Sequence, residues 1–156
     1  MALTEAYLKS LLGKHIRDIC PIGYTEDSDN HCAHFVSHVL GYQFNTTCRT
    51  MVNGTGTPAT IRVQDVFARC WQVGNWDDCP VPLFWGLVFI TNAHNVNIAA
   101  KQMVNVPRKH IGIFYGGPRT IYHYSNSQRK VVTQAPEEFS HHYASPDNAM
   151  FWGSAP

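Results

Sequence analysis

The sequence has few charged residues and no cluster of one sign. Asp, Glu, Lys and Arg make up 15% of the 156 residues, against about 25% in an average soluble domain. Twelve basic and 11 acidic residues give a formal net charge of +1, and Lys and Arg occur in runs of two at most, such as Arg129-Lys130. A nucleic-acid surface needs a run of cations that neutralises phosphates. The composition therefore excludes nucleic acid as the expected partner.

The sequence also lacks a long hydrophobic run and a Sec signal peptide. Its longest apolar stretch, residues 83–90, is about half the length that spans a bilayer. The N-terminal segment MALTEAYLKSLLGK has no charged region followed by a continuous apolar core, and it is more typical of an amphipathic helix. We expect no membrane span and synthesis in the cytoplasm, with any action outside the cytoplasm requiring delivery by a route other than Sec.

No two of the five cysteines form a C-x-x-C pair, which argues against a zinc ribbon. The odd number leaves at least one thiol outside any disulfide scheme. The others could pair in an oxidising compartment or stay reduced and buried. We expect four of them to have structural roles: Cys20, Cys48, Cys70 and Cys79.

Enough apolar residues are present for one core. Hydrophobic residues make up 44% of the chain, with 8 Phe, 7 Tyr and 4 Trp. A chain of this length usually forms one domain. We therefore expect a single domain over residues 1–156.

Two helices are predicted at either side of a loop-rich region. Thr4 can cap a first helix that ends at Gly13, with Leu8, Leu11 and Leu12 on one face. Residues 45–60 are rich in Thr, Asn and Gly and are typical of a loop. Residues 61–71 have the apolar spacing of a short helix with Val63, Val66, Phe67 and Cys70 facing inward.

The second half of the chain is rich in apolar runs separated by turns. Strands are expected at residues 87–90, 111–115, 120–124 and 131–132, with a last edge strand at 150–152. Helices followed by a meander of strands are typical of an α+β fold with an antiparallel sheet.

Cys32 lies where the chemistry of a thiol nucleophile favours it. The segment HCAHFVSHVLGY has the apolar spacing of a helix that ends at Gly41, with Asp29 or Asn30 as its N-cap. Cys32 then falls in the first turn. Partial positive charge at a helix N-terminus lowers the pKa of a thiol, and the free N–H groups there can stabilise an oxyanion.

Two strand histidines can complete a catalytic group with Cys32. His110 begins the expected strand at 111–115, and His123 lies on the next strand across the turn at residues 116–118. Neighbouring antiparallel strands bring such residues side by side. A thiol, a base and a group that orients the base form the general triad of covalent catalysis.

These residues resemble the NlpC/P60 and CHAP cell-wall hydrolases of the papain-like superfamily. The NlpC/P60 pattern runs Asp-Cys-Ser-Gly-Phe-Val, Gly-Asp-Leu-Val-Phe, His-Val-Gly-Ile-Tyr and Ile-His-Ala. The matching segments here are residues 30–36, 86–89, 110–114 and 121–123. The resemblance covers residues 20–132.

The resemblance implies a papain-like fold with N-terminal helices packed on a central antiparallel sheet. It implies Cys32 as nucleophile, His110 as base and His123 as the orienting group, without a cofactor or a catalytic metal. The expected reaction is cleavage of an amide bond in peptidoglycan peptides through an acyl-enzyme. Tyr24 corresponds to a tyrosine that the family places upstream of its cysteine, near the substrate.

The resemblance also suggests a biological setting. Without a Sec signal or a wall-binding module, the chain fits a phage lysin or a bacteriolytic effector delivered to the cell wall or periplasm. A delivered toxin implies a cognate inhibitor (immunity) protein as partner. The chain departs from the family at His31, which replaces the Asp, and at Ala33-His34, which replace Ser-Gly.

A polar insertion at residues 92–108 precedes the strand of His110. Loops of this length in compact domains often cover functional sites. It contains four asparagines, which can bind a peptide without adding charge: Asn92, Asn95, Asn97 and Asn105. We expect it to shape the substrate groove.

Two alternatives remain open. The same fold could support an acyltransferase or a deamidase. His34 and His38 are spaced i, i+4, a spacing that metal ligands use, and His141-His142 with Glu137-Glu138 could complete a zinc site. Because Ala33, Val36 and Val39 occupy the core side of this helix, a solvated row of histidines is the other interpretation.

Overall fold

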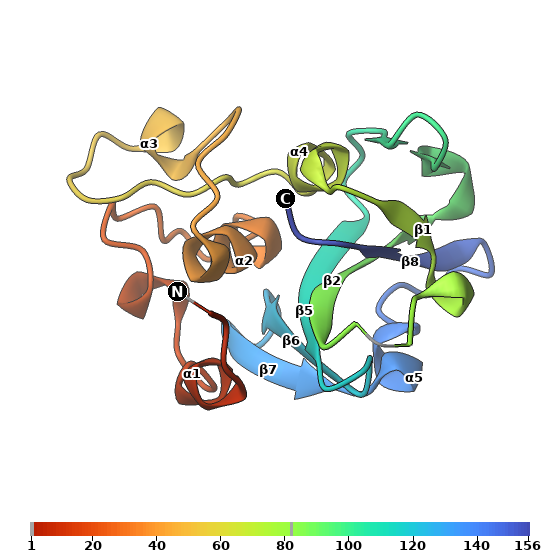
Figure 1. The fold of residues 1–156 in the computed structure, drawn as a ribbon. Helices are drawn as coiled ribbons and strands as arrows, with labels where there is room; N and C mark the ends of the chain where they lie inside the picture. Colours follow the sequence, from red (N-terminus) through yellow and green to blue (C-terminus); the bar gives the residue numbers. More distant parts are fainter. Residues whose placement is uncertain (1, 82) are drawn as a thin grey trace.

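A computed structural model describes residues 2–81 and 83–156 (Figure 1). Within them, six strands form one sheet in the order β1-β8-β2-β5-β6-β7, and every neighbouring pair is antiparallel. The strands are β1 (Val73–Asn75), β2 (Trp85–Asn92), β5 (Lys109–Tyr115), β6 (Thr120–Ser125), β7 (Lys130–Gln134) and β8 (Asn148–Gly153). The predicted α+β class with an antiparallel sheet is confirmed.

Both faces of the sheet are buried. Leu87, Phe89 and Ile111 belong to the core on the face that α2 covers. Val88 and Ile90 belong to a second core on the opposite face. Because successive strand residues point to opposite faces, a central strand covered on both faces is a continuous apolar run, as 87–90 is.

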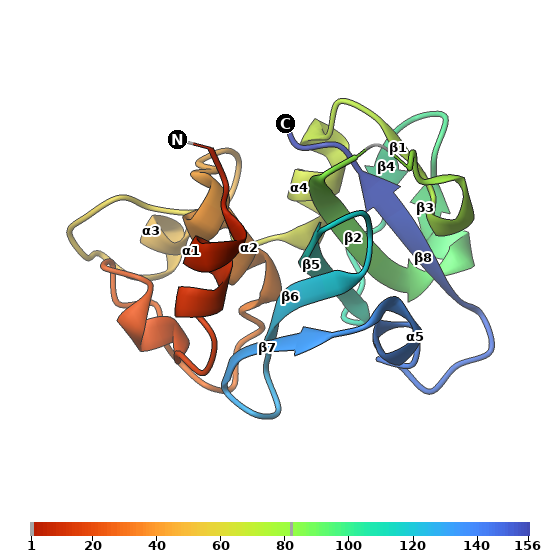
Figure 2. The ribbon, with the colours of Figure 1, turned by 60° about the horizontal axis from the view of Figure 1, so that its bottom comes forward.

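The helices lie on both sides of the sheet. They are α1 (Glu5–Ser10), α2 (Cys32–Leu40), α3 (Cys48–Met51), α4 (Val63–Arg69) and α5 (Pro136–Phe139), with single turns η1 (Ile16–Asp18), η2 (Trp76–Asp78) and η3 (Ala93–Asn95). Helix α2 packs against β5 and β6 and separates them from α3, whereas α5 lies by β7 on the other side (Figure 2). No helix in the described residues is long and apolar enough to cross a membrane.

The local signals for the helices are largely confirmed. The Thr4 side chain accepts a hydrogen bond from the backbone N–H of Tyr7 at 3.2 Å. Gly41 ends α2 with a φ of 77°, a left-handed conformation that glycine adopts without strain. Leu12 differs from the prediction: α1 ends before it, and its side chain is 40% exposed.

A strand forms near residue 150 as predicted, but its predicted position at the edge of the sheet is wrong. Strand β8 pairs with β2 on one side and β1 on the other, so it lies inside the sheet and β1 forms the edge. The physical reason is that Phe151 and Trp152 are buried in the cores on opposite faces, and only an interior position covers both.

The predicted loops contain short elements. Helix α3 lies within residues 45–60, and the insertion at 92–108 folds into a small hairpin of β3 (Val96–Asn97) and β4 (Gln102–Met103). These elements are too short for a periodic apolar pattern to predict them.

Removal of β8 should therefore unfold the domain. A chain that ends at residue 147 loses the hydrogen bonds of two strand pairs and the side chains of Phe151 and Trp152. We expect it to lose cooperative unfolding in denaturant, followed by circular dichroism. A chain lacking only residues 155–156 is the control and should unfold like the full chain. Cooperative unfolding of the shorter chain at an unchanged midpoint would contradict the central position of β8.

Candidate active site

The start of α2 is fixed by two asparagines. The Asn30 side-chain oxygen accepts a hydrogen bond from the backbone N–H of Cys32 at 3.0 Å. Asn126, in the turn after β6, accepts from the N–H of His31 at 2.9 Å and donates to the same Asn30 oxygen at 3.0 Å. The N-cap is His31, one residue after the predicted Asn30, and it makes no side-chain capping bond. The Asn30 side chain instead joins the start of the helix to the sheet through Asn126. Because Asn30 and Asn126 accept from these two N–H groups, neither group is free to bind an oxyanion in this state.

The Cys32 thiol lies at the end of α2 that faces β5, and it is 1% exposed. Backbone N–H groups of Ile111 and Ala33 and the Lys109 ammonium favour its thiolate form, but burial outweighs them and raises the pKa of Cys32 to about 11. The expected lowering of this pKa is therefore wrong for this state. The helix terminus acts in the expected direction, but loss of hydration is the larger effect.

His110 and His123 meet as the sequence predicts. The register of β5 and β6 pairs Ile113 with Tyr122, which puts the two imidazoles on the same face of the sheet. His110 Nε2 lies 2.8 Å from His123 Nδ1, and the rings meet edge to face. This is the geometry of a base whose ring is oriented by a second imidazole.

The other nitrogens of this pair have no hydrogen-bond partner in the described part of the chain. His110 Nδ1 and His123 Nε2 are both buried and unbonded. Burial, followed by the neighbouring histidines, lowers the pKa of His110 well below its usual value. Burial also lowers the pKa of His123 to about 4. Both rings are therefore neutral near pH 7, and when His110 Nε2 donates to His123, Nδ1 of His110 keeps a free lone pair.

Two aromatic residues after α5 cover the pair, and the sequence did not indicate this. His142 stacks on His110 with ring centroids 4.0 Å apart and an interplanar angle of 11°. Tyr143 packs edge to face on His142 at 4.6 Å. The thiol of Cys32 contributes to raising the pKa of Tyr143 after burial itself, so Tyr143 also lies near the thiol. His142 therefore belongs to this site and not to a site with His34.

His31 and His34 at the start of α2 are buried and His38 is half-buried, so the interpretation as a solvated row is wrong. His31 and His34 are 1% and 0% exposed. Their Nδ1 atoms lie 3.0 Å apart, and the other nitrogen of His31 lies 2.7 Å from the backbone oxygen of Glu26. His38 Nε2 lies 3.2 Å from His34 Nε2. Three imidazoles are thus linked in one chain of hydrogen bonds.

Tyr24 lies between this histidine chain and a small cavity. Its ring contacts the rings of His31 and His34, at 5.2 and 5.3 Å between centroids. Burial, and then Asp29, raise the pKa of Tyr24 to about 12. A cavity of about 190 Å³ opens beside it, lined also by Asn30, Arg62, Asn105 and Lys109. A role for Tyr24 in substrate binding stays a prediction.

The insertion at 92–108 lines two cavities. Asn105 borders the small cavity near the start of α2. Asn95 and Asn97 line a larger one of about 940 Å³, between the insertion, α4 and β8. The insertion therefore reaches the neighbourhood of Cys32 at its end, while most of it surrounds a separate hollow.

No family model, curated protein or solved structure matches this chain. The resemblance to NlpC/P60 and CHAP hydrolases therefore stays a prediction, and a functional argument rests on the geometry of the site.

The buried histidine pair predicts a loss of stability in acid. The unfolded chain protonates His123 below a pH of about 6.5, whereas the folded chain resists protonation down to about 4. The free energy of unfolding should be fully present above pH 6.5 and fall as the pH drops toward 4, with a slope of up to about 1.4 kcal/mol per pH unit for each such group.

Replacing His123 should make this slope shallower. We expect His123→Asn to reduce the slope of the unfolding free energy between pH 6.5 and 4, measured by urea titration at several pH values. His94→Asn is the matched control, because His94 is exposed. An equal slope in wild type and His123→Asn would show that His123 gains its proton as readily in the folded chain as in the unfolded one.

Proposed function

We propose that the protein is a cysteine hydrolase that cleaves amide bonds in peptidoglycan peptides. Cys32 is the nucleophile, His110 the base and His123 the group that orients the base. The observation that supports this most directly is the 2.8 Å contact between His110 Nε2 and His123 Nδ1. His110 Nδ1 is buried without a hydrogen-bond partner among the described residues. The Cys32 thiol makes no hydrogen bond to it here, so the two must approach when substrate binds.

The reaction begins from neutral groups. Burial keeps the Cys32 thiol protonated and the His110 ring neutral. As the sulfur attacks the amide carbonyl, the thiol proton passes to His110 Nδ1, and the resulting imidazolium keeps its Nε2–H bond to His123. The C–N bond breaks when the imidazolium returns this proton to the leaving amine. Water, deprotonated by His110, then hydrolyses the thioester and restores the thiol.

The small cavity beside the start of α2 supports a peptide substrate with free carboxylates. Two cations, Arg62 and Lys109, line it together with the amide of Asn105 and the phenol of Tyr24. Stem peptides of peptidoglycan expose carboxylates and amides, which these groups can bind. Because Cys32 is 1% exposed, substrate binding requires the side chains over the thiol to move aside.

The biological setting follows from this substrate. A peptidoglycan hydrolase of this kind would act as a phage lysin or as an effector delivered to the cell wall, and an effector would have a cognate inhibitor protein in the producing cell. An acyltransferase or a deamidase would use the same three residues. The acyltransferase would pass the acyl group to an acceptor other than water, and the deamidase would hydrolyse a primary amide and release ammonia. Mass spectrometry of the products separates these activities, because only hydrolysis of a peptide cross-link yields two new fragments that together gain one water.

Loss of either proton-transfer partner should abolish activity. We expect Cys32→Ala and His110→Ala each to lower kcat/KM on purified peptidoglycan fragments by about a thousandfold or more, and the double variant to lose little beyond either one. Cys79→Ala and His94→Ala, which lie outside the site, are the matched controls. Wild-type turnover by Cys32→Ala would refute the proposed nucleophile.

His123 should be replaceable by a side chain that accepts a hydrogen bond. In His123→Asn the amide oxygen can accept from His110 Nε2, so we expect most activity to remain. His123→Ala leaves that N–H buried without a partner, and kcat/KM should fall by on the order of a hundredfold. The comparison is made at several pH values, because loss of the partner should also shift the acid limb of the rate profile. Equal activity of His123→Ala and wild type would make His123 a structural residue.

A further inference from the structure

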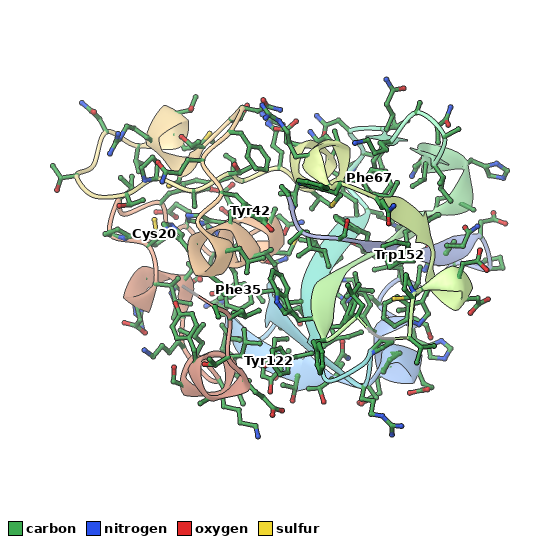
Figure 3. The ribbon with its side chains drawn as sticks, viewed as in Figure 1. Cys20, Phe35, Tyr42, Phe67, Tyr122 and Trp152 are labelled. Atoms are coloured by element: carbon green, nitrogen blue, oxygen red, sulfur yellow. The ribbon has the colours of Figure 1, made fainter. Side chains whose placement is uncertain are left out.

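Four metal-binding side chains converge on α2 outside the proposed catalytic residues. Cys20 follows η1, His34 and His38 come from α2, and Cys48 is the first residue of α3. One ligand atom from each lies within 4.8 Å of all the others. Cys20 lies on the side of α2 away from the sheet (Figure 3).

We propose that Cys20, His34, His38 and Cys48 bind one zinc ion in a tetrahedral Cys2His2 site. His34 and His38 are the pair whose i, i+4 spacing in the sequence is typical of metal ligands. The other two ligands are cysteines from distant loops, in place of the histidines and glutamates after residue 136 considered from the sequence.

The distances between like atoms match a tetrahedral zinc centre. Zn–S bonds of about 2.3 Å and Zn–N bonds of about 2.0–2.1 Å place two sulfurs about 3.8 Å apart and two nitrogens about 3.3 Å apart at the tetrahedral angle. The observed separations are 3.9 Å between the sulfurs of Cys20 and Cys48, and 3.2 Å between the Nε2 atoms of His34 and His38.

Neighbouring groups already hold two of these ligands as a metal site requires. The Nδ1 of His34 is free to donate to Nδ1 of His31, whose other nitrogen donates to the Glu26 carbonyl. With its proton on Nδ1, His34 keeps a lone pair on Nε2 that can bind the metal together with the other three ligands. The backbone N–H of Ala59 donates to the sulfur of Cys48 at 3.4 Å. Such bonds orient imidazole ligands and balance the charge of thiolates.

The ligand set favours zinc in a structural role. Two thiolates cancel the charge of a divalent ion, so the centre would be neutral at a place where Cys20, His34 and Cys48 are 4%, 0% and 0% exposed. Tetrahedral S2N2 coordination is typical of zinc. Four ligand atoms within 4.8 Å leave room for one ion and not for an iron–sulfur cluster. With all four positions taken by protein, the ion has no open position for catalysis.

The site would tie the least regular part of the chain to its central helix. The segments that provide Cys20 and Cys48 contain only η1 and α3 as regular elements between α1 and α2 and between α2 and α4. Zinc bound by residues from both segments would fix them against α2. This site is independent of the proposed reaction, because none of its ligands belongs to the catalytic group.

The test measures metal binding by the full chain, purified with a reductant. We expect one zinc per chain by elemental analysis, and, after removal of the metal and addition of Co²⁺, the intense visible bands and sulfur-to-cobalt charge-transfer band of a tetrahedral thiolate site. Cys48→Ser and His38→Asn should lose the bound zinc or shift these bands. Cys79→Ser, His141→Asn and Cys32→Ala are controls and should keep one zinc per chain, the last one even without hydrolase activity.

Three outcomes would overturn the site. One is a reduced, folded wild-type chain that binds neither zinc nor cobalt. Another is a cobalt spectrum with the weak bands of six-coordinate oxygen ligation. The third is a Cys20–Cys48 disulfide in the protein as first isolated, before any treatment that removes metal, found by peptide mapping. Because the cobalt spectrum is recorded on the wild-type chain, failure of a variant to fold does not decide the question.

Discussion

The structure depends on the burial of α2 from two sides. Its sheet-facing side packs on β5 and β6 through residues such as Phe35 and Val36. Its other side places His34 at 0% exposure among the N-terminal loops. A helix enclosed in this way must either be apolar all round or satisfy every polar side chain that it buries. The buried polar side chains of α2 are Cys32, His34 and Ser37. The two proposed sites account for the thiol and the imidazole, whereas the Ser37 hydroxyl is buried without a hydrogen-bond partner in the part of the chain that the structure describes.

The same burial sets the chemistry of the proposed reaction. Loss of hydration raises the pKa of Cys32 and lowers the pKa of His110, so neither group is charged before substrate binds. A preformed thiolate–imidazolium pair would need water or other charges to stabilise it, and the apolar cores on both faces of the sheet offer little of either. When Cys32 and His110 are both neutral, the free-energy cost of burying two charges arises only in the transition state. The bond from His110 to His123 then stabilises the positive charge at the moment it forms.

Features determined by neighbouring residues could be predicted from the sequence. The limits of α2 follow from Asn30 and Gly41, and the meeting of His110 with His123 follows from two strands and the tight turn between them. Features determined by distant contacts could not. The place of β8 inside the sheet, the cover of His142 over His110 and the approach of Cys20 to Cys48 all join segments that no periodic pattern relates. The raised pKa of Cys32 could not be predicted either, because it depends on the residues that bury the thiol.

His31 connects the two proposed sites. Its backbone N–H binds Asn126, whose side chain also bonds that of Asn30, the acceptor for the N–H of Cys32. Its ring accepts from His34 and donates to the carbonyl of Glu26. An aspartate at this position, as in the NlpC/P60 pattern, could accept from His34 but could not donate to that carbonyl, and it would bury a negative charge. A neutral imidazole makes both hydrogen bonds without burying a charge.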